Sequence, residues 1–546
     1  MRAADISDLW WRTAVYYCLD IETFQDSNGD GAGDLEGLAS RVDYLADLGV
    51  TCLWLMPFQP TPDRDDGYDI SDFYNVDRRA GDLGHFVELL RIAHGRGIRV
   101  IIDLVLNHTS DRHPWFVEAR RSRDSEYRDY YVWRDKPPRN AQPTVFPGEE
   151  ASSWEKDERS GQYYLHSFYR HQPDLNLANP RVREEIARII GFWAQLGVDG
   201  FRVDAVPFLI NPPGAADETD PHGFLRELHR FVGRRRGDAV LLGEVGLPQQ
   251  EQREYFGLHE TELDLQFDFE TAQAIFLALV RGDARPIAES LKRRPTVDVR
   301  QGWVTFLRNH DELSLQMLSA EEREEVFEAL APDERQRVYG RGIVRRLAPM
   351  LRGEPRRLRL AYSLLFSLPG APLLFYGEEI GMGELEGMGD RRAVRSPMQW
   401  RRGPTAGFST ARPSRLVREL PGGGYGPEHV NVHDQLRSPD SLLSFIKTLI
   451  ARYRSAPEIA WGELVLHDVG DPQVLVHSLR TDEATFLAVH NVGDDARQVR
   501  IDEDAVGPDR LIDLLEPVGP VEAEDGVFRV ALDGWGFRWF RAGAEH

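Results

Sequence analysis

Acidic, amide and histidine side chains stand at the ends of several apolar, strand-like runs of this sequence. In chain order they are Asp103, Asn107 and His108, then Arg202 and Asp204, then Glu244, and finally Asn309, His310 and Asp311. A single acid at a strand end is usually a turn residue or a helix cap. Four such groups after four strands instead predict one shared site, because the carboxyl ends of parallel barrel strands converge on a single pocket.

Two of these acids are expected to differ in charge. Arg202 lies two residues before Asp204, so in an extended strand both side chains point to the same face, and the arginine should keep Asp204 ionised. Glu244 has an apolar flank, which raises the pKa of a carboxyl group and keeps its proton available. We therefore expect an ionised carboxylate at Asp204 beside a protonated carboxyl group at Glu244.

Eight short apolar runs alternate with amphipathic helical stretches such as VREEIARIIGFWAQLG, the pattern of parallel β/α units. The predicted strands cover residues 14–20, 51–57, 99–107, 200–205, 239–245, 263–269, 303–309 and 372–377. Eight such units close a barrel. The predicted fold class is α/β, a (β/α)8 TIM barrel.

Three regions interrupt or follow the barrel pattern. Residues 109–178, after the third strand, are rich in Pro, Asp, Arg and aromatic residues without a clear helix, which predicts an inserted small domain over the barrel mouth. Residues 313–360 are charged and helical in pattern, including RQRVYGRGIVRRLAPML, and should form a lid segment. Alternating segments in 456–546 predict a C-terminal antiparallel β-sandwich. The barrel itself is assigned to 1–108 and 179–455.

The bulk composition of this 546-residue chain argues against two classes of binding partner. Its formal net charge of -23 argues against nucleic acid, which needs clustered cations. No run reaches the ~20 apolar residues of a membrane span and no signal peptide is recognised, so we expect no membrane partner and a cytoplasmic location. Cys18 and Cys52 fall in apolar runs and are expected to be buried free thiols. Homo-oligomer formation stays open.

The motifs DLVLNH, GFRVDAVP, LLGEV and FLRNHDE, in this order and spacing, resemble the four motif regions of the α-amylase superfamily, and QPDLN (172–176) resembles its fifth. The resemblance implies that Asp204 is the nucleophile, Glu244 the acid/base and Asp311 a third carboxylate that stabilises the transition state. It implies further that Arg202 orients the nucleophile. The residues that it assigns to sugar binding are His108, His310, Phe146 and Gln172.

The implied reaction is retaining glycoside chemistry, which needs two carboxyl groups roughly 5 to 5.5 Å apart. Adjacent strand ends can supply that spacing. Asp69 and Arg391 resemble the ion pair that closes subsite -1 in exo-acting members. An ordinary loop turn is the alternative for Asp69, and Arg392 and Arg395 compete with Arg391 for the second place.

The stretch DSNGDGAGD (26–34) predicts a structural calcium site, because its oxygen donors are spaced as in a calcium loop. The predicted ligands are Asp26, Asn28, Asp30, Ala32 and Asp34. Position 12 of the loop is Gly37, so the bidentate Glu of an EF-hand is missing, and an Asx-turn loop without an ion is the alternative. The resemblance alone implies a second calcium at Asn107 and Asp174. No organic cofactor is expected.

Within the superfamily, YDISDFYNV, RNHDELSL and RSPMQW followed by TAGFS resemble the trehalose synthases, which interconvert maltose and trehalose. One stretch departs from that group: VGLPQQ follows Glu244 where Ala-Asn-Gln-Trp is usual. The alternatives are an exo-acting α-glucosidase and a non-catalytic relative. The predicted ligand is a small α-glucoside such as maltose, trehalose or sucrose.

Overall fold

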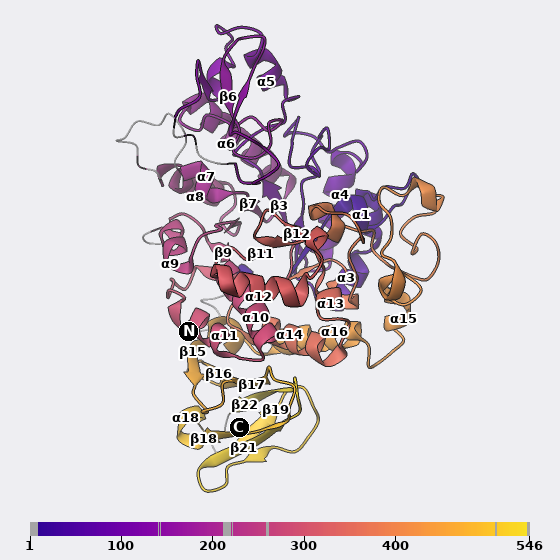
Figure 1. Ribbon diagram of the computed structural model, residues 1–546, viewed down its shortest axis with the longest axis vertical. Coiled ribbons are helices and arrows are strands. Elements are labelled where there is room, and N and C mark those ends of the chain that lie inside the picture. The colour runs from indigo at the N-terminus through magenta and orange to yellow at the C-terminus, as the bar shows by residue number, and fades with distance from the viewer. Residues whose placement is uncertain are drawn as a thin grey trace.

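The computed structural model describes residues 9–542 except 140, 142–143, 211–219, 221, 258–260 and 508–509. Eight parallel strands form a closed barrel in the order β1-β14-β10-β9-β8-β7-β3-β2 (Figure 1). They are β1 (Tyr16–Leu19), β2 (Cys52–Leu55), β3 (Arg99–Leu104), β7 (Gly200–Val203), β8 (Val240–Gly243), β9 (Leu265–Phe267), β10 (Gly302–Phe306) and β14 (Ala371–Phe375). Six of them lie within a predicted strand, and β10 and β14 each begin one residue before the predicted range, so the predicted barrel is confirmed.

The strands are mostly apolar because helices cover the outside of the barrel and side chains fill its inside. The main covering helices are α4 (Leu83–Gly95), α6 (Pro180–Leu196), α8 (Gly223–Arg235), α10 (Phe269–Arg281), α14 (Pro355–Ser367) and α16 (Leu442–Ser455). α6 shows how the sequence sets its ends. Asn179 caps the first turn, Pro180 occupies the first helical position, and Gly197 ends the helix in a left-handed conformation with φ 114°.

The region after β3 contains a small antiparallel sheet in the order β4-β6-β5. Its strands are β4 (Trp133–Arg134), β5 (Trp154–Lys156) and β6 (Tyr163–Leu165). It also contains one short helix, α5 (Pro114–Ala119), which the sequence analysis did not expect. Pro114 at the first helical position and the His113 side chain, which accepts from the amide of Trp115, start that helix.

The region after β10 is only partly as predicted. α12 (Ala320–Leu330) is the expected helix, begun by a capping box at Ser319 and Glu322. The helix expected over RQRVYGRGIVRRLAPML is wrong for most of its length: β12 (Arg337–Val338) and β13 (Gly342–Ile343) form a hairpin that pairs with β11 (Leu313–Ser314). Tyr339 (φ 54°) and Gly340 (φ 65°) make a turn that no α-helix accommodates.

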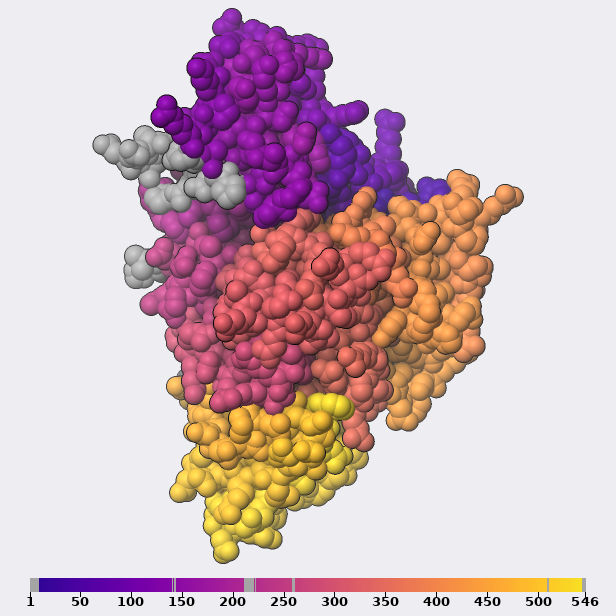
Figure 2. Space-filling view, viewed as in Figure 1, coloured from indigo at the N-terminus to yellow at the C-terminus, as the bar shows by residue number. Residues whose placement is uncertain are grey.

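The C-terminal strands form two antiparallel sheets, of six and two strands, with an apolar core between them. They are β15 (Glu463–His467), β16 (Val474–Arg480), β17 (Thr485–Asn491), β18 (Arg497–Asp502), β19 (Arg510–Asp513), β20 (Val521–Glu522), β21 (Val527–Leu532) and β22 (Phe537–Ala542). Figure 2 shows this part in yellow at the opposite end of the molecule from the insertion after β3. The predicted sandwich is confirmed.

Cys18 and Cys52 are buried free thiols, as expected. Over the part of the chain that the structure describes, no helix is both long and apolar enough to cross a membrane.

Candidate active site

A single buried guanidinium joins the carboxyl groups at three neighbouring strand ends. Arg202, on β7, has a side chain that is only 1% exposed. Its Nη1 lies 2.6 Å from Asp103 Oδ1 and also bonds Asp204 Oδ1, and its Nη2 lies 2.8 Å from Glu244 Oε2. The strands are hydrogen-bonded neighbours in the order β3, β7, β8, and Asp103 is the register partner of Arg202. The predicted convergence at the strand ends is therefore observed.

Burial dominates the ionisation of both central acids. It raises the pKa of Asp204 to about 6, against the lowering effect of Arg202. It raises the pKa of Glu244 to about 7, again opposed by Arg202 and reinforced by the negative charges of Asp204 and Asp311. The two pKa values follow the expected direction, with the lower one at Asp204. The sequence analysis missed the ion pair between Arg202 and Glu244.

The turn after Asp204 ties the two acids together. Ala205 has φ 48°, which is uncommon for a residue with a Cβ. Its amide donates to Glu244 Oε2 over 3.1 Å, and the amide of Val206 donates to the Glu244 carbonyl over 3.1 Å. The strained turn at the end of β7 thus fixes Glu244 directly beside Asp204.

The third carboxylate, Asp311, lies among cations and a histidine. His310 Nε2 lies 3.0 Å from Asp311 Oδ2, and Arg391 Nη1 and Arg395 Nη2 lie 2.8 and 3.1 Å from its Oδ1. Burial opposes the charge of Asp311, but these neighbours lower the pKa of its carboxyl group well below the ordinary value. Tyr68 OH lies 2.7 Å from His310 Nε2, and the Tyr68 ring stacks on the His310 ring. Asp311 is therefore held as a fixed negative charge.

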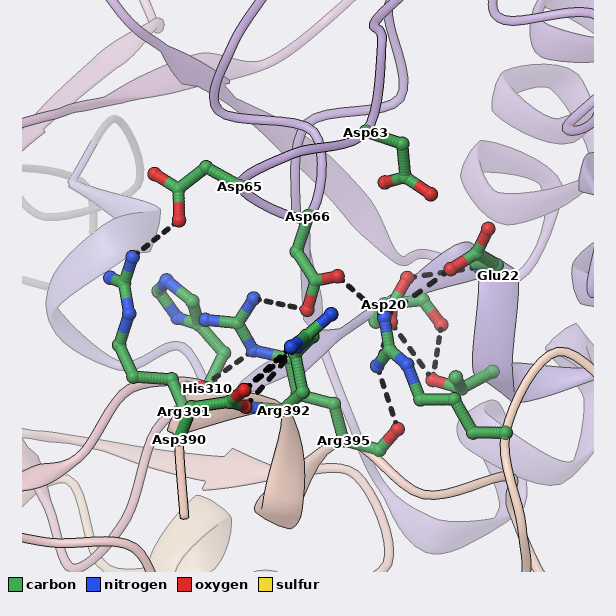
Figure 3. Close-up of polar contacts among 12 residues, drawn as sticks. Asp20, Glu22, Asp63, Asp65, Asp66, His310, Asp390, Arg391, Arg392 and Arg395 are labelled. Carbon is green, nitrogen blue, oxygen red and sulfur yellow. Dashed lines mark hydrogen bonds and ion pairs between the residues drawn. The ribbon is translucent and has the colours of Figure 1, made fainter. Parts of the chain in front are cut away.

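The ion pair predicted between Asp69 and Arg391 is wrong. Arg391 Nη2 pairs with Asp65 Oδ1 at 2.6 Å, as Figure 3 shows, and Gln172 donates to the other oxygen of Asp65 over 2.8 Å. Asp69 is fully buried and accepts instead from Thr61 Oγ1 (2.8 Å) and from the amide of Asp65 (3.2 Å). Asp69 therefore shapes the loop that presents Asp65.

The three competing arginines differ in their partners, although Arg391 and Arg395 share Asp311. Arg391 contacts Asp65 and Asp311 at the cavity, as predicted for the second member of the pair. Arg392 pairs with Asp390 near the surface. Arg395 is buried and contacts both Asp66, at 2.7 Å, and Asp311. It is therefore a second cation on Asp311, which the sequence analysis considered only as an alternative to Arg391.

These groups line a cavity of about 530 Å³, within the range of small-molecule sites. Of the predicted residues, Asp204, Glu244, Asp311, His108, Phe146 and Arg391 line it. Arg202 and His310 lie behind its wall, and Gln172 acts on it through Asp65. The lining residues that the sequence analysis did not select include Asp65, Tyr68, Phe168, Glu312, Gln316 and Arg341. Gln316 and Arg341 belong to loops whose position depends on the tertiary fold, so their spacing in the sequence could not predict that they line the cavity.

Segments from two loops meet across the mouth of this cavity. Arg341, in the turn between β12 and β13, donates to the carbonyl of Val145 over 2.7 Å. The ring of Tyr339 lies 4.8 Å from that of Phe146, centroid to centroid, and Arg391 lies 4.9 Å from the same Phe146 ring. The hairpin after β10 and the insertion after β3 therefore contact each other directly beside the site.

The loop at 26–34 presents hard oxygen donors that are already hydrogen-bonded. Asp26 accepts from the amides of Gly29 (2.7 Å) and Gly31 (2.9 Å), and Asp30 accepts from the amide of Ala32 (2.9 Å). Asn28 accepts from the amide of Asp30 (2.9 Å), and Asp34 caps α2 (Leu35–Ser40). Asp26 Oδ2 also accepts from Ser409 Oγ, and Asp34 Oδ2 accepts from the amide and the hydroxyl of Ser27. Carboxylate and amide oxygens are the donor types that calcium prefers, although these two oxygens already accept two hydrogen bonds each. In the described ranges no three His, Cys, Asp or Glu side chains gather as a metal-binding group.

The residues of the second predicted calcium site pair with each other. Asn107 Nδ2 donates to Asp174 Oδ1 over 3.1 Å, and the amide of Ser167 donates to the same oxygen over 3.0 Å. Burial raises the pKa of Asp174 to about 7. These two residues thus close a buried hydrogen-bonded link between the end of β3 and the insertion that follows it.

Comparison with known proteins agrees with this geometry. The family described as alpha amylase, catalytic domain, matches residues 21–331 and 343–462, and a sucrose hydrolase-like C-terminal domain matches 484–541. A trehalose synthase/amylase of Mycobacterium tuberculosis is 41% identical over 97% of this chain and 90% of its own length. An oligo-1,6-glucosidase of Parageobacillus thermoglucosidasius is 30% identical over 98% of this chain and 99% of its own. The crystal structure of the trehalulose synthase MutB from Pseudomonas mesoacidophila superposes with a TM-score of 0.78 at 27% identity, covering 97% and 99% of the two chains.

Replacing the proposed nucleophile tests its role directly. In Asp204→Asn, hydrolysis of an activated aryl α-glucoside should fall at least about a thousandfold, because the amide cannot form the covalent intermediate. Melting temperature should show that the fold survives, and Asp390→Asn, which alters an acid near the surface, serves as the control. A rate for Asp204→Asn close to that of the wild type would show that another residue attacks the sugar.

The two raised pKa values predict a bell-shaped pH dependence of kcat/KM. If Asp204 is the nucleophile and Glu244 the acid/base, activity should fall below about pH 6 and above about pH 7, with the two values belonging to the coupled pair. In Glu244→Gln the alkaline limb should disappear for a substrate whose leaving group needs no proton, and azide should restore turnover. An unchanged alkaline limb and no azide rescue would remove Glu244 from the acid/base role.

Proposed function

The chain belongs to the alpha-amylase family, and on this premise we propose that it is a retaining α-glucosyl-transferring enzyme that interconverts maltose and trehalose. Asp204 attacks the anomeric carbon while the Glu244 proton moves to the departing glycosidic oxygen, which leaves a glucosyl ester on Asp204 and a free glucose. Glu244, now ionised, takes the proton from a different hydroxyl of that glucose as it attacks the ester from the same face. Both α-glucosides are thus reached through one intermediate.

Fixed charges around the sugar support these steps. Arg202 holds the oxygens of Asp204 and Glu244 in place, so neither acid has to reorient during transfer. Asp311 remains negative beside the ring that develops positive charge in the transition state. The pair of Asp65 and Arg391 closes the far end of the cavity, which suits a terminal glucose rather than an internal chain unit.

The observation that carries the isomerase proposal is the contact between Arg341 and the Val145 carbonyl, with Tyr339 against Phe146. A cleaved glucose retained beneath these contacting segments would stand at high effective concentration beside the Asp204 ester. Water would be excluded from the same space. Transfer to the retained glucose should then be faster than hydrolysis.

One observation favours exo-acting α-glucosidase activity as a second candidate. After Glu244 the cavity wall is formed by Gly246 and Leu247, so no polar side chain from this stretch holds an acceptor sugar. The similarity to an oligo-1,6-glucosidase over nearly the whole chain supports the same alternative. Both functions share the glucosyl-Asp204 step and differ in what becomes of the released glucose.

Incubation of maltose with ¹³C-labelled free glucose distinguishes the two functions. Retention of the cleaved glucose predicts early trehalose with little label, measured by mass spectrometry. Arg341→Ala, which removes the contact to Val145, should increase hydrolysis and the labelled fraction, whereas Arg335→Ala, an exposed arginine of the same segment, should not. Heavily labelled trehalose would indicate an open site, and glucose without trehalose would reject the isomerase in favour of the glucosidase.

We also propose that the loop at 26–34 binds a structural calcium ion through oxygens of Asp26, Asn28, Asp30, Ala32 and Asp34. An ion that binds the folded state alone raises its stability. Excess calcium should therefore raise the melting temperature of chelator-treated protein. Asp30→Ala should diminish that rise and Asp47→Ala, an exposed acid on α3 (Val42–Leu48), should leave it unchanged. Equal melting temperatures with and without calcium would show that the hydrogen-bonded loop is stable without an ion.

A further inference from the structure

Arg418 lies in a segment that none of the sequence motifs covers, and its side chain is only 8% exposed. Its Nη2 lies 2.7 Å from Asp66 Oδ1 and 3.3 Å from Glu22 Oε2, and its Nη1 lies 3.5 Å from Asp20 Oδ2. Nη1 also donates to the backbone carbonyl of Arg395 over 2.8 Å. One arginine thus contacts the end of β1, the loop at 63–67 and the segment that carries Arg395.

Asp66 divides its two oxygens between two arginines. Its Oδ1 takes Arg418 and its Oδ2 takes Arg395 at 2.7 Å, and Arg395 in turn reaches Asp311 at 3.1 Å. Figure 3 shows Asp65 and Asp66 turned toward different partners, Asp65 toward Arg391 and Asp66 toward Arg395. The ion pairs therefore run in one chain from Arg418 through Asp66 and Arg395 to Asp311.

The backbone at Asp66 is held in an unfavourable conformation by these contacts. Asp66 has φ 48°, and Gly67 after it has φ 94°, where a Cβ would lie 2.6 Å from the Pro57 carbonyl oxygen. A left-handed conformation persists at a residue with a side chain only where its surroundings enforce it. The two arginines on Asp66 supply that constraint, and the turn lets consecutive aspartates serve Arg391 and Arg395 separately.

We propose that Arg418 is a positioning residue for the third carboxylate: by neutralising Asp66, it leaves Arg395 free to hold Asp311. Among the described residues, Arg395 is the ion-pair partner that stays within 4 Å of Asp66 when Arg418 is removed. A buried carboxylate that loses one cation binds the other more strongly, because charge in a dry site must be compensated. Arg395 would then move toward Asp66, and Asp311 would lose one of its two guanidinium contacts.

The first experiment measures turnover of an activated aryl α-glucoside by Arg418→Met. The number of working sites is counted by trapping Asp204 with a slow fluoroglucosyl substrate, so partly unfolded protein does not enter the rate. We expect kcat per trapped site to fall about tenfold to a hundredfold, the usual effect of a small misplacement, with little change in KM. Arg79→Met is the matched control, because Arg79 pairs with Glu22, Asp63 and Asp77 at the outer side of the same cluster.

A compensating substitution separates positioning from general stability. Asp66→Asn combined with Arg418→Met removes the uncompensated charge at position 66, the one that competes for Arg395, and Asn tolerates the positive φ of this position. Arg395 then keeps its ion pair with Asp311, so the double variant should regain most of the wild-type kcat per trapped site. If Arg418→Met does not fold, the proposal is tested by the double variant only. A large loss of kcat per trapped site in the double variant then overturns the proposal.

A wild-type rate in Arg418→Met, or an equal loss in Arg79→Met, would also overturn it. The assay follows glucosyl transfer to Asp204, which the isomerase and the glucosidase share. The outcome of the labelled-glucose experiment therefore does not change the meaning of this one.

Discussion

The site depends on one buried guanidinium that three carboxyl groups share. Arg202 is almost inaccessible to water, and burying a charge in this way is stable only where its hydrogen-bond partners are supplied. The partners come from the ends of β3, β7 and β8, so the arginine also fixes the spacing between strands of the barrel. The proposed nucleophile and acid/base contact the same cation, which restrains their separation. Their geometry is consequently a property of the barrel closure, not of any single loop.

The sequence predicted the features that depend on short-range pattern. Short apolar runs identified all eight strands, because strands buried on both faces leave little freedom in composition. The acids at their ends could be assigned to one pocket because a parallel barrel has only one carboxyl-terminal face. Tyr339 and Gly340 show where this reasoning failed: a charged segment with helical periodicity folds as a hairpin, and the positive φ values of its turn override that pattern.

The sequence also failed to predict the correct partners in long-range ion pairs. Four aspartates, at positions 63, 65, 66 and 69, lie within one loop, and spacing alone could not show which faces Arg391. The choice is made by backbone conformation, since Asp66 is left-handed and Asp69 is used to bind Thr61 and the amide of Asp65. Sequence distance between partners is also large: Arg391 and Asp65 are 326 residues apart, so their contact exists only after the barrel has closed.

The predicted calcium loop is connected with the catalytic groups through the same network. A Cβ on Gly31 would lie 1.9 Å from the Arg415 carbonyl oxygen, and the amide of Val417 donates to the Gly31 carbonyl over 2.8 Å. Ser409 Oγ bonds Asp26 in the same loop. The segment that carries Arg418 is therefore packed against residues 26–34 on one side and against Asp66 on the other. Because close-packed groups transmit small displacements, we expect a change that loosens this loop to disturb Arg418 and, through Asp66 and Arg395, Asp311. A continuous series of contacts thus links residues 26–34 to the third carboxylate, although the two lie far apart in the chain.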